Sequence, residues 1–66
     1  MLKVAKIIDF VNDNYNFNIC IDFNDKILIA IFNDDLTSEL QLEIEYETTT
    51  EEVIDIIKTK LDELQN

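Results

Sequence analysis

The sequence predicts an α+β domain in the order helix, three strands, helix, with the strands in an antiparallel meander and both helices on one face of the sheet. Two patterns support this prediction. Apolar residues recur at helical spacing near both ends of the chain, and between these segments they alternate with polar residues at strand spacing. With 66 residues, the chain is predicted to form a single domain over residues 1–66.

The first helix is predicted at about residues 2–13, because apolar side chains return there to one helical face. That face consists of Val4, Ile7, Ile8, Val11 and Tyr15. The run Asn12-Asp13-Asn14 is expected to end the helix, since asparagine tolerates the left-handed conformation of a helix stop and the chain has no glycine.

The second helix is predicted at about residues 50–64, and its start is marked by a capping box. Thr49 is the expected N-cap, and Glu52 lies three residues further on, where its carboxylate can reach back to the cap. Carboxylates in the first turn also favour a helix start because they face the positive end of its dipole. The expected buried stripe consists of Val53, Ile54, Ile57, Leu61 and Leu64.

Three strands are predicted between the helices. Apolar and polar residues alternate strictly over residues 15–23, and Asn24-Asp25 is a plausible hairpin turn because both residues accept positive φ. A second strand is expected over residues 26–33 and, after a loop at residues 33–38, a third over residues 40–47.

The negative charge of the chain is concentrated in one folded segment. The formal net charge is −10, yet residues 1–26 sum to −1 and residues 58–66 sum to zero. Between Ile27 and Ile57 there is no basic residue. The carboxylates of this segment are Asp34, Asp35, Glu39, Glu43, Glu45, Glu47, Glu51, Glu52 and Asp55. Like charges held together on a surface repel one another, which favours a positively charged partner.

The third strand is expected to present an acidic row on one face, because alternate residues of a strand lie on the same side. We predict a partner-binding surface with Glu39, Glu43, Glu45 and Glu47 in the row and Asp34, Asp35, Glu51 and Glu52 at its rim. The alternative is a solvated outer face that carries glutamate only to remain dissolved and to block edge pairing.

The second strand is apolar on both faces, so its register decides which side chains are left open. With a two-residue turn, Ile27, Ile29 and Ile31 would project from the face that the helices do not cover. With a three-residue loop, that face would instead carry Leu28, Ala30 and Phe32. Ile27, Ile29 and Ile31 are the candidate apolar interface, either for a homodimer or for another protein.

The composition argues against several classes of function. There is no histidine and only one cysteine, Cys20, so neither a structural zinc site nor an internal disulfide is expected, and a lone thiol fits the cytoplasm. No cofactor, no metal and no enzymatic activity are expected, because no nucleophile with a nearby base is evident. The charge argues against direct binding to nucleic acid or to an anionic membrane.

The order of elements resembles that of double-stranded-RNA-binding domains, but those need basic residues at the start of the second helix, where this chain has Thr50-Glu51-Glu52. The absence of glycine, proline and arginine beside abundant Ile, Asn, Asp and Lys suggests an AT-rich genome, such as that of a low-GC bacterium or its phage. In size, acidity and layout the chain resembles small acidic phage-encoded inhibitors that mimic DNA, and among them anti-CRISPR proteins that act on type II CRISPR nucleases.

This resemblance implies a non-enzymatic inhibitor that occupies a basic nucleic-acid-binding groove of a nuclease or another DNA-binding protein, in the cytoplasm of a bacterial host. The alternative is a small homodimeric interaction or regulatory module, similar to an antitoxin, that binds through an apolar sheet face.

Overall fold

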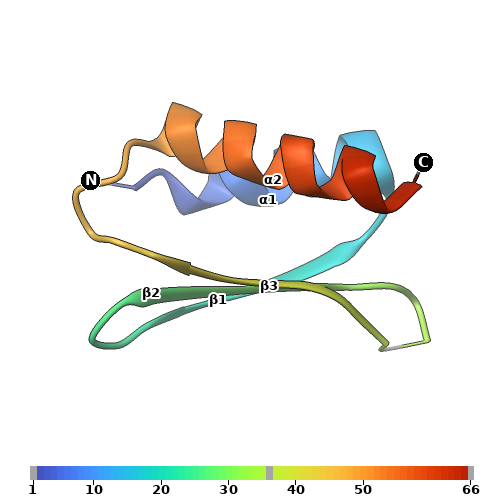
Figure 1. The fold of residues 1–66 in the computed structure, drawn as a ribbon, viewed down its shortest axis with the longest axis horizontal. Helices are drawn as coiled ribbons and strands as arrows, with labels where there is room; N and C mark the ends of the chain where they lie inside the picture. Colours follow the sequence, from blue (N-terminus) through green and yellow to red (C-terminus); the bar gives the residue numbers. More distant parts are fainter. Residues whose placement is uncertain (1, 36, 66) are drawn as a thin grey trace.

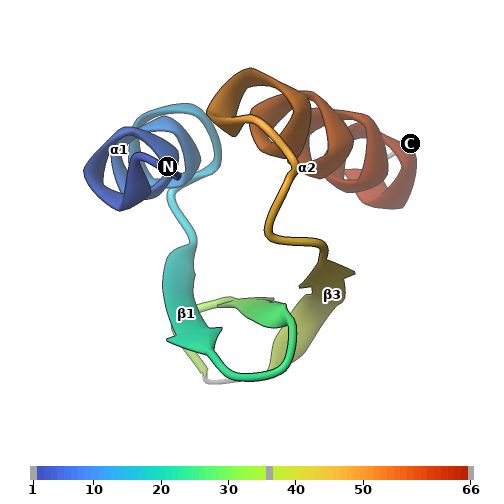
Figure 2. The ribbon, with the colours of Figure 1, turned by 90° about the vertical axis from the view of Figure 1, so that its left-hand side faces the viewer.

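The computed structural model describes residues 2–35 and 37–65, and it confirms the predicted αβββα order. The elements are α1 (Val4–Tyr15), β1 (Asn18–Phe23), β2 (Ile27–Phe32), β3 (Ser38–Ile44) and α2 (Thr50–Gln65). The strands form one antiparallel sheet in the order β1-β2-β3. Figures 1 and 2 show both helices in one layer above the sheet, which leaves the opposite face of the sheet uncovered.

Helix α1 ends through an asparagine, but later than the sequence predicts. Asn16 has the left-handed conformation, with φ 57°, and its N–H bonds to the carbonyl of Asn12. Asn14 remains inside the helix and donates from its side chain to the carbonyl of Phe10 at 2.9 Å. The helix therefore ends at Tyr15 and not at about residue 13, which is about half a turn later than predicted, although the predicted chemistry of the stop is the one observed.

The start of α1 is tied to the start of α2 by a contact that the sequence pattern does not reveal. Lys3, which precedes α1, provides no side-chain cap, and its backbone N–H donates to Oγ1 of Thr50 at 2.9 Å. Thr50 is 5% exposed, so this bond satisfies a polar side chain that is otherwise removed from water. The first residues of both helices are thus held side by side.

The predicted capping box at the start of α2 is confirmed. Oγ1 of Thr49 accepts from the N–H of Glu52 at 3.1 Å, and Oε1 of Glu52 accepts from the N–H of Thr49 at 3.1 Å. The backbone N–H and then the hydroxyl of Thr49 lower the pKa of the Glu52 carboxyl. This pair satisfies two backbone donors that the helix itself leaves unpaired.

Replacement of Thr49 with alanine is expected to lower the free energy of unfolding by about 1 kcal/mol, because the N–H of Glu52 loses its acceptor. Urea denaturation followed by circular dichroism measures the change. Thr59→Ala is the matched control, since Thr59 is exposed inside α2 and caps nothing. Equal stability of the two variants would contradict a stabilising role for the cap.

The other ends of the helices are joined by Tyr15 and Asp62. The Tyr15 hydroxyl donates to Oδ1 of Asp62 at 2.7 Å, and the Tyr15 ring lies edge-on to Phe10 and stacks with Phe17. This hydrogen bond, followed by burial, raises the pKa of Tyr15 from 10.0 to about 12. The same bond is the main cause of the lowered pKa of Asp62, with Lys58 contributing further.

Tyr15 is expected to titrate with a midpoint of about 12, which absorbance at 295 nm measures in a Tyr46→Phe variant. Because the folded state raises this pKa, the stabilisation is present below pH 10 and is lost as the pH rises towards 12. Asp62 behaves in the opposite sense: its contribution is present above its ordinary pKa of 3.8 and is lost as the pH falls. A Tyr15 midpoint near 10 would show that the bond is absent in solution.

The β1–β2 hairpin has a three-residue loop, and this decides which face of β2 is buried. Phe23 pairs with Ile27 across the hairpin, and the N–H of Asn24 bonds to the carbonyl of Lys26. The two-residue turn is therefore wrong. The candidate apolar interface of Ile27, Ile29 and Ile31 is therefore wrong as well. These side chains lie in the core, where they are 1%, 1% and 0% exposed.

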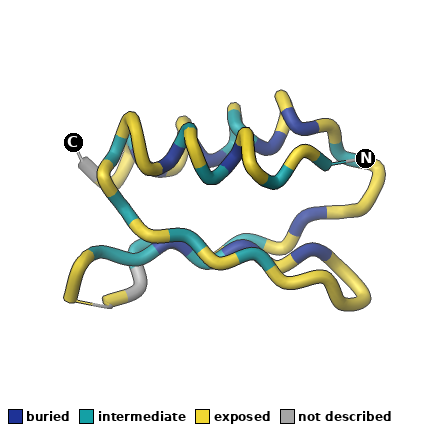
Figure 3. Tube along the Cα trace, turned by 180° about the vertical axis from the view of Figure 1, so that it is seen from behind, coloured by how far each residue is buried: buried dark blue, intermediate teal, exposed yellow. Residues whose placement is uncertain are grey.

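The core fills the space between the helix layer and the sheet, where buried stretches of both face each other (Figure 3). It consists of Ile7, Val11, Ile27, Ile29, Ile31, Ile44, Val53, Ile57 and Leu61. Leu64, which the sequence pattern assigns to the buried stripe of α2, is instead 56% exposed. Isoleucine dominates the centre of the sheet because its branched side chain suits a pleated, covered surface.

Strand β3 begins and ends earlier than the sequence predicts. It ends at Ile44, and the chain then turns, with the N–H of Thr48 bonded to the carbonyl of Glu45. The register shifts beside Ile31 and Phe32, which pair with Leu40 and Ser38, so Glu39 is an extra residue in a bulge. This bulge and the glutamates of β3 protect one edge of the sheet from pairing with another strand.

Candidate partner-binding site

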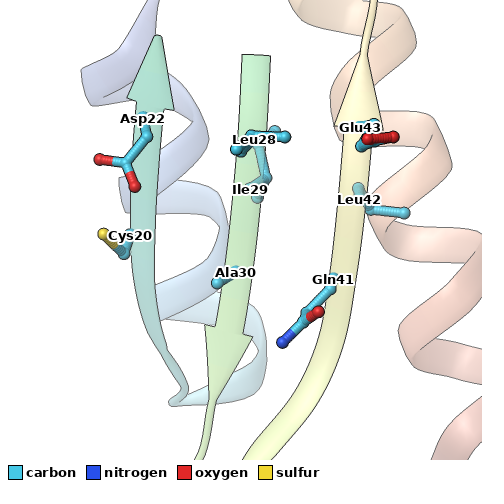
Figure 4. A pocket seen from close by; sticks show the side chains of 8 residues that line it. All are labelled: Cys20, Asp22, Leu28, Ile29, Ala30, Gln41, Leu42 and Glu43. Carbon is cyan, nitrogen blue, oxygen red and sulfur yellow. The ribbon is translucent and has the colours of Figure 1, made fainter. Parts of the chain in front are cut away.

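On the uncovered face of the sheet, two acidic side chains lie on either side of an apolar one. Asp22 on β1 and Glu43 on β3 are both directly opposite Leu28 on β2. Figure 4 shows these three side chains in one row, on the side of the strands away from the helices. The next row consists of Cys20, Ala30 and Gln41. We call these six residues the open sheet face.

The open sheet face contains a shallow hollow of about 640 Å³, which these six residues line together with Ile29 and Leu42. Two of its lining residues, Cys20 and Ala30, have small side chains, whereas the neighbouring row of Asp22, Leu28 and Glu43 has larger ones. Leu28 is 36% exposed at the centre of that row. The hollow is therefore apolar in its middle and carries a carboxylate on either side.

The eight predicted partner-binding carboxylates do not form one patch. Asp34 and Asp35 lie in the loop after β2, at one end of the long axis of the molecule, while the segment 45–52 lies at the opposite end (Figure 1). The longest extent of the molecule is 29 Å, so carboxylates at its two ends cannot contact the same side chain of a partner. Glu39 and Glu43 lie between them on β3. Because β3 ends at Ile44, Glu45 and Glu47 are in the following turn and do not continue the strand row.

Four of the eight carboxylates are engaged within the domain. Glu45 pairs with Nζ of Lys26 at 3.1 Å, and this bond is the main reason that the pKa of Lys26 is raised. Glu51 pairs with Lys6 of α1 at 3.4 Å. The pKa of Glu51 is lowered, first by a bond from its own backbone N–H and then by this lysine. The remaining two are Glu52, in the capping box, and Glu39, which accepts from Nδ2 of Asn33 at 3.1 Å.

The side chains of Asp34, Asp35, Glu43 and Glu47 make no hydrogen bond or ion pair with another described residue, although the charge of Glu43 contributes to the raised pKa of Lys26. Asp22 is likewise unpaired within the described chain, and it is a residue that the predicted surface omits. Strand alternation already places it on the same face as Cys20, but its approach to Glu43 depends on the pairing of three strands. The structure thus centres the site on Asp22 and Glu43.

A second apolar hollow, of about 480 Å³, lies at the end of the sheet near the start of α1. Phe23 and Tyr46 are 53% and 51% exposed beside it, with ring centroids 6.5 Å apart. The Tyr46 hydroxyl donates to the carbonyl of Asn24, which fixes the ring against the β1–β2 loop. Leu2, Val4 and Ile27 complete the lining.

Within the described part of the chain, no three carboxylate or thiol side chains converge to hold a metal ion. Of the two described helices, neither has the length and apolar character needed to cross a membrane. Cys20 is a free, exposed thiol on the open sheet face. Comparison of the chain with protein-family models, with curated proteins and with solved structures found no match.

Proposed function

We propose that this protein is a non-enzymatic inhibitor that covers a basic nucleic-acid-binding surface of another protein. One observation carries the proposal: two unpaired carboxylates, Asp22 and Glu43, face the same way from the two edge strands of a sheet whose strands contain no basic residue. Ordinary solvated faces mix both signs of charge.

The sheet supports these carboxylates in a way that suits competition with phosphate groups. Adjacent strands are about 4.8 Å apart, so the backbones at Asp22 and Glu43 are separated by about 10 Å on a rigid, hydrogen-bonded frame. Glu39 in the bulge of β3 and Glu47 in the turn after it add negative charge near the two ends of this strand. Lysine- and arginine-lined grooves attract such a surface, which speeds encounter and selects the partner.

The anti-CRISPR resemblance suggests a type II CRISPR nuclease as one partner of this kind. The alternative homodimer through the sheet face meets an electrostatic obstacle, since two copies of the open sheet face would bring their Asp22 and Glu43 side chains together. Sedimentation at low and high salt tests that alternative: a dimer of this kind is expected to strengthen as salt screens the repulsion.

Competition with duplex DNA tests the proposed function. The immobilised protein is exposed to lysate of a low-GC bacterium and to a purified type II CRISPR nuclease, and duplex DNA or increasing salt is then added. Retained proteins are expected to elute with duplex DNA. Binding is also expected to weaken steeply as the salt is raised from about 0.05 to 0.2 M, because salt screens the attraction between carboxylates and the basic side chains of the partner. Proteins that stay bound in both DNA and salt would contradict the proposal.

A further inference from the structure

We infer that the open sheet face takes one basic amphipathic helix of its partner, with apolar side chains along β2 and lysine or arginine side chains on both flanks. This inference rests on the proposed function and names the element that enters the site. A surface that only replaces DNA phosphates needs charge, whereas this hollow has an apolar centre of Leu28 and Ala30.

The width of the site fits a helix. The backbones at Asp22 and Glu43 are about 10 Å apart across Leu28, and an α-helix with its side chains is about 10–12 Å in diameter. A helix lying along β2 therefore has one carboxylate at each flank. Lysine or arginine at the edges of its apolar face would reach these carboxylates from either side.

The spacing along the strand also fits. The outward residues of β2 are Leu28, Ala30 and Phe32, which follow one another at about 6.7 Å. Residues four apart on a helix rise about 6 Å, so successive apolar positions of one helix face can pack on successive outward residues of β2. The small Cys20 and Ala30 line the hollow next to Leu28 and leave room there for a larger side chain of a partner.

Charge complementarity selects this occupant over a second copy of the chain. The open sheet face of another copy would oppose Asp22 and Glu43 with like charges, and the net charge of −10 adds to that repulsion. A helix with basic flanks removes the repulsion. An apolar centre with a charged rim is also the usual anatomy of a protein–protein interface.

A designed peptide probes this site directly. The peptide has about twelve residues, or about three helical turns, with leucines on one face and lysines on both flanks. One control peptide has the same composition in an order without an apolar stripe, and a second contains lysine without leucine. Fluorescence anisotropy measures the affinities, and amide chemical shifts locate the binding. The amphipathic peptide is expected to bind at least tenfold more tightly than either control and to shift the amides of residues 20–22, 28–32 and 41–43.

Two pairs of matched variants test the contacts. Leu28→Ser is expected to weaken peptide binding about tenfold, whereas Leu64→Ser, at a more exposed leucine of α2, leaves it unchanged. Glu43→Gln is expected to weaken it about threefold at low salt, whereas Glu63→Gln leaves it unchanged. Equal affinity of the amphipathic and control peptides, or wild-type affinity of Leu28→Ser, would overturn the helix inference.

The two proposals fail in different ways. If the leucine-free lysine peptide binds as tightly as the amphipathic one while duplex DNA still elutes the natural partner, the helix inference is wrong and the proposed function stands. If the amphipathic peptide binds on the open sheet face but DNA does not elute the partner, the proposed function is wrong and the helix site stands.

Discussion

Replacement of Ile29 with asparagine is expected to unfold the domain. Ile29 is 1% exposed at the centre of β2, between Ile21 and Leu42 in the neighbouring strands. Truncating a buried isoleucine costs about 2–5 kcal/mol, and an amide left there without partners adds to that cost. A domain of this size has a net stability of only about 3–5 kcal/mol, so the folded state is expected to be a minority. Far-ultraviolet circular dichroism and urea titration measure the loss.

The matched control is Leu28→Asn, which makes a similar change one residue away. Leu28 points to the open sheet face and is 36% exposed, so the asparagine remains hydrated and the expected loss of stability is below about 1 kcal/mol. The pair of variants is a test of the hairpin register, because a shift by one residue exchanges the two faces. An unfolded Leu28→Asn beside a stable Ile29→Asn would show that the loop has two residues.

Features that depend on neighbouring residues in the chain could be predicted from the sequence. The positions of Ile7 and Val11, and of Val53, Ile57 and Leu61, define two helical faces, and all of them lie in the core. The capping box is equally local, since Thr49 and Glu52 are three residues apart. Two amphipathic helices and three short strands leave few ways to cover one face of a sheet, which is why the fold class is correct.

Features that depend on loop length or on distant pairing could not be predicted. The outward and inward residues of β2 are all apolar, so hydrophobic alternation does not distinguish a two-residue from a three-residue hairpin loop. The bond from Lys3 to Thr50 joins residues 47 positions apart and leaves no periodic pattern in the sequence.

The candidate site was predicted in part for the same reason. A continuous acidic row needs a long third strand, but β3 ends at Ile44 and the chain turns before Glu47. The predicted rim also grouped Asp34 and Asp35 with Glu51 and Glu52 of α2, although the meander places these two pairs at opposite ends of the molecule (Figure 1). The pairing of three strands, in contrast, adds Asp22 to Glu43.

Reversal of the two central charges, Asp22→Lys with Glu43→Lys, is expected to abolish binding to the basic partner while the domain stays folded. Both side chains are exposed and unpaired, so their replacement removes no described hydrogen bond or ion pair and leaves the core intact. At the interface, two attractive contacts become two like-charge contacts, each of which costs several kcal/mol. We expect a loss of affinity of at least about a hundredfold, measured by DNA displacement from the partner and by direct binding.

The control must separate the position of the charge from its amount. Asp55→Lys with Glu63→Lys makes the same change in net charge, from −10 to −6, because each of the two substitutions adds two charges. Asp55 and Glu63 are exposed on α2, in the layer away from the open sheet face, and they make no ion pair with another described residue (Figure 2). If net charge alone drives association, both double variants lose affinity equally. If the open sheet face binds the partner, the α2 variant keeps most of its affinity. Full inhibition by the folded Asp22→Lys, Glu43→Lys variant would exclude this face as the binding surface.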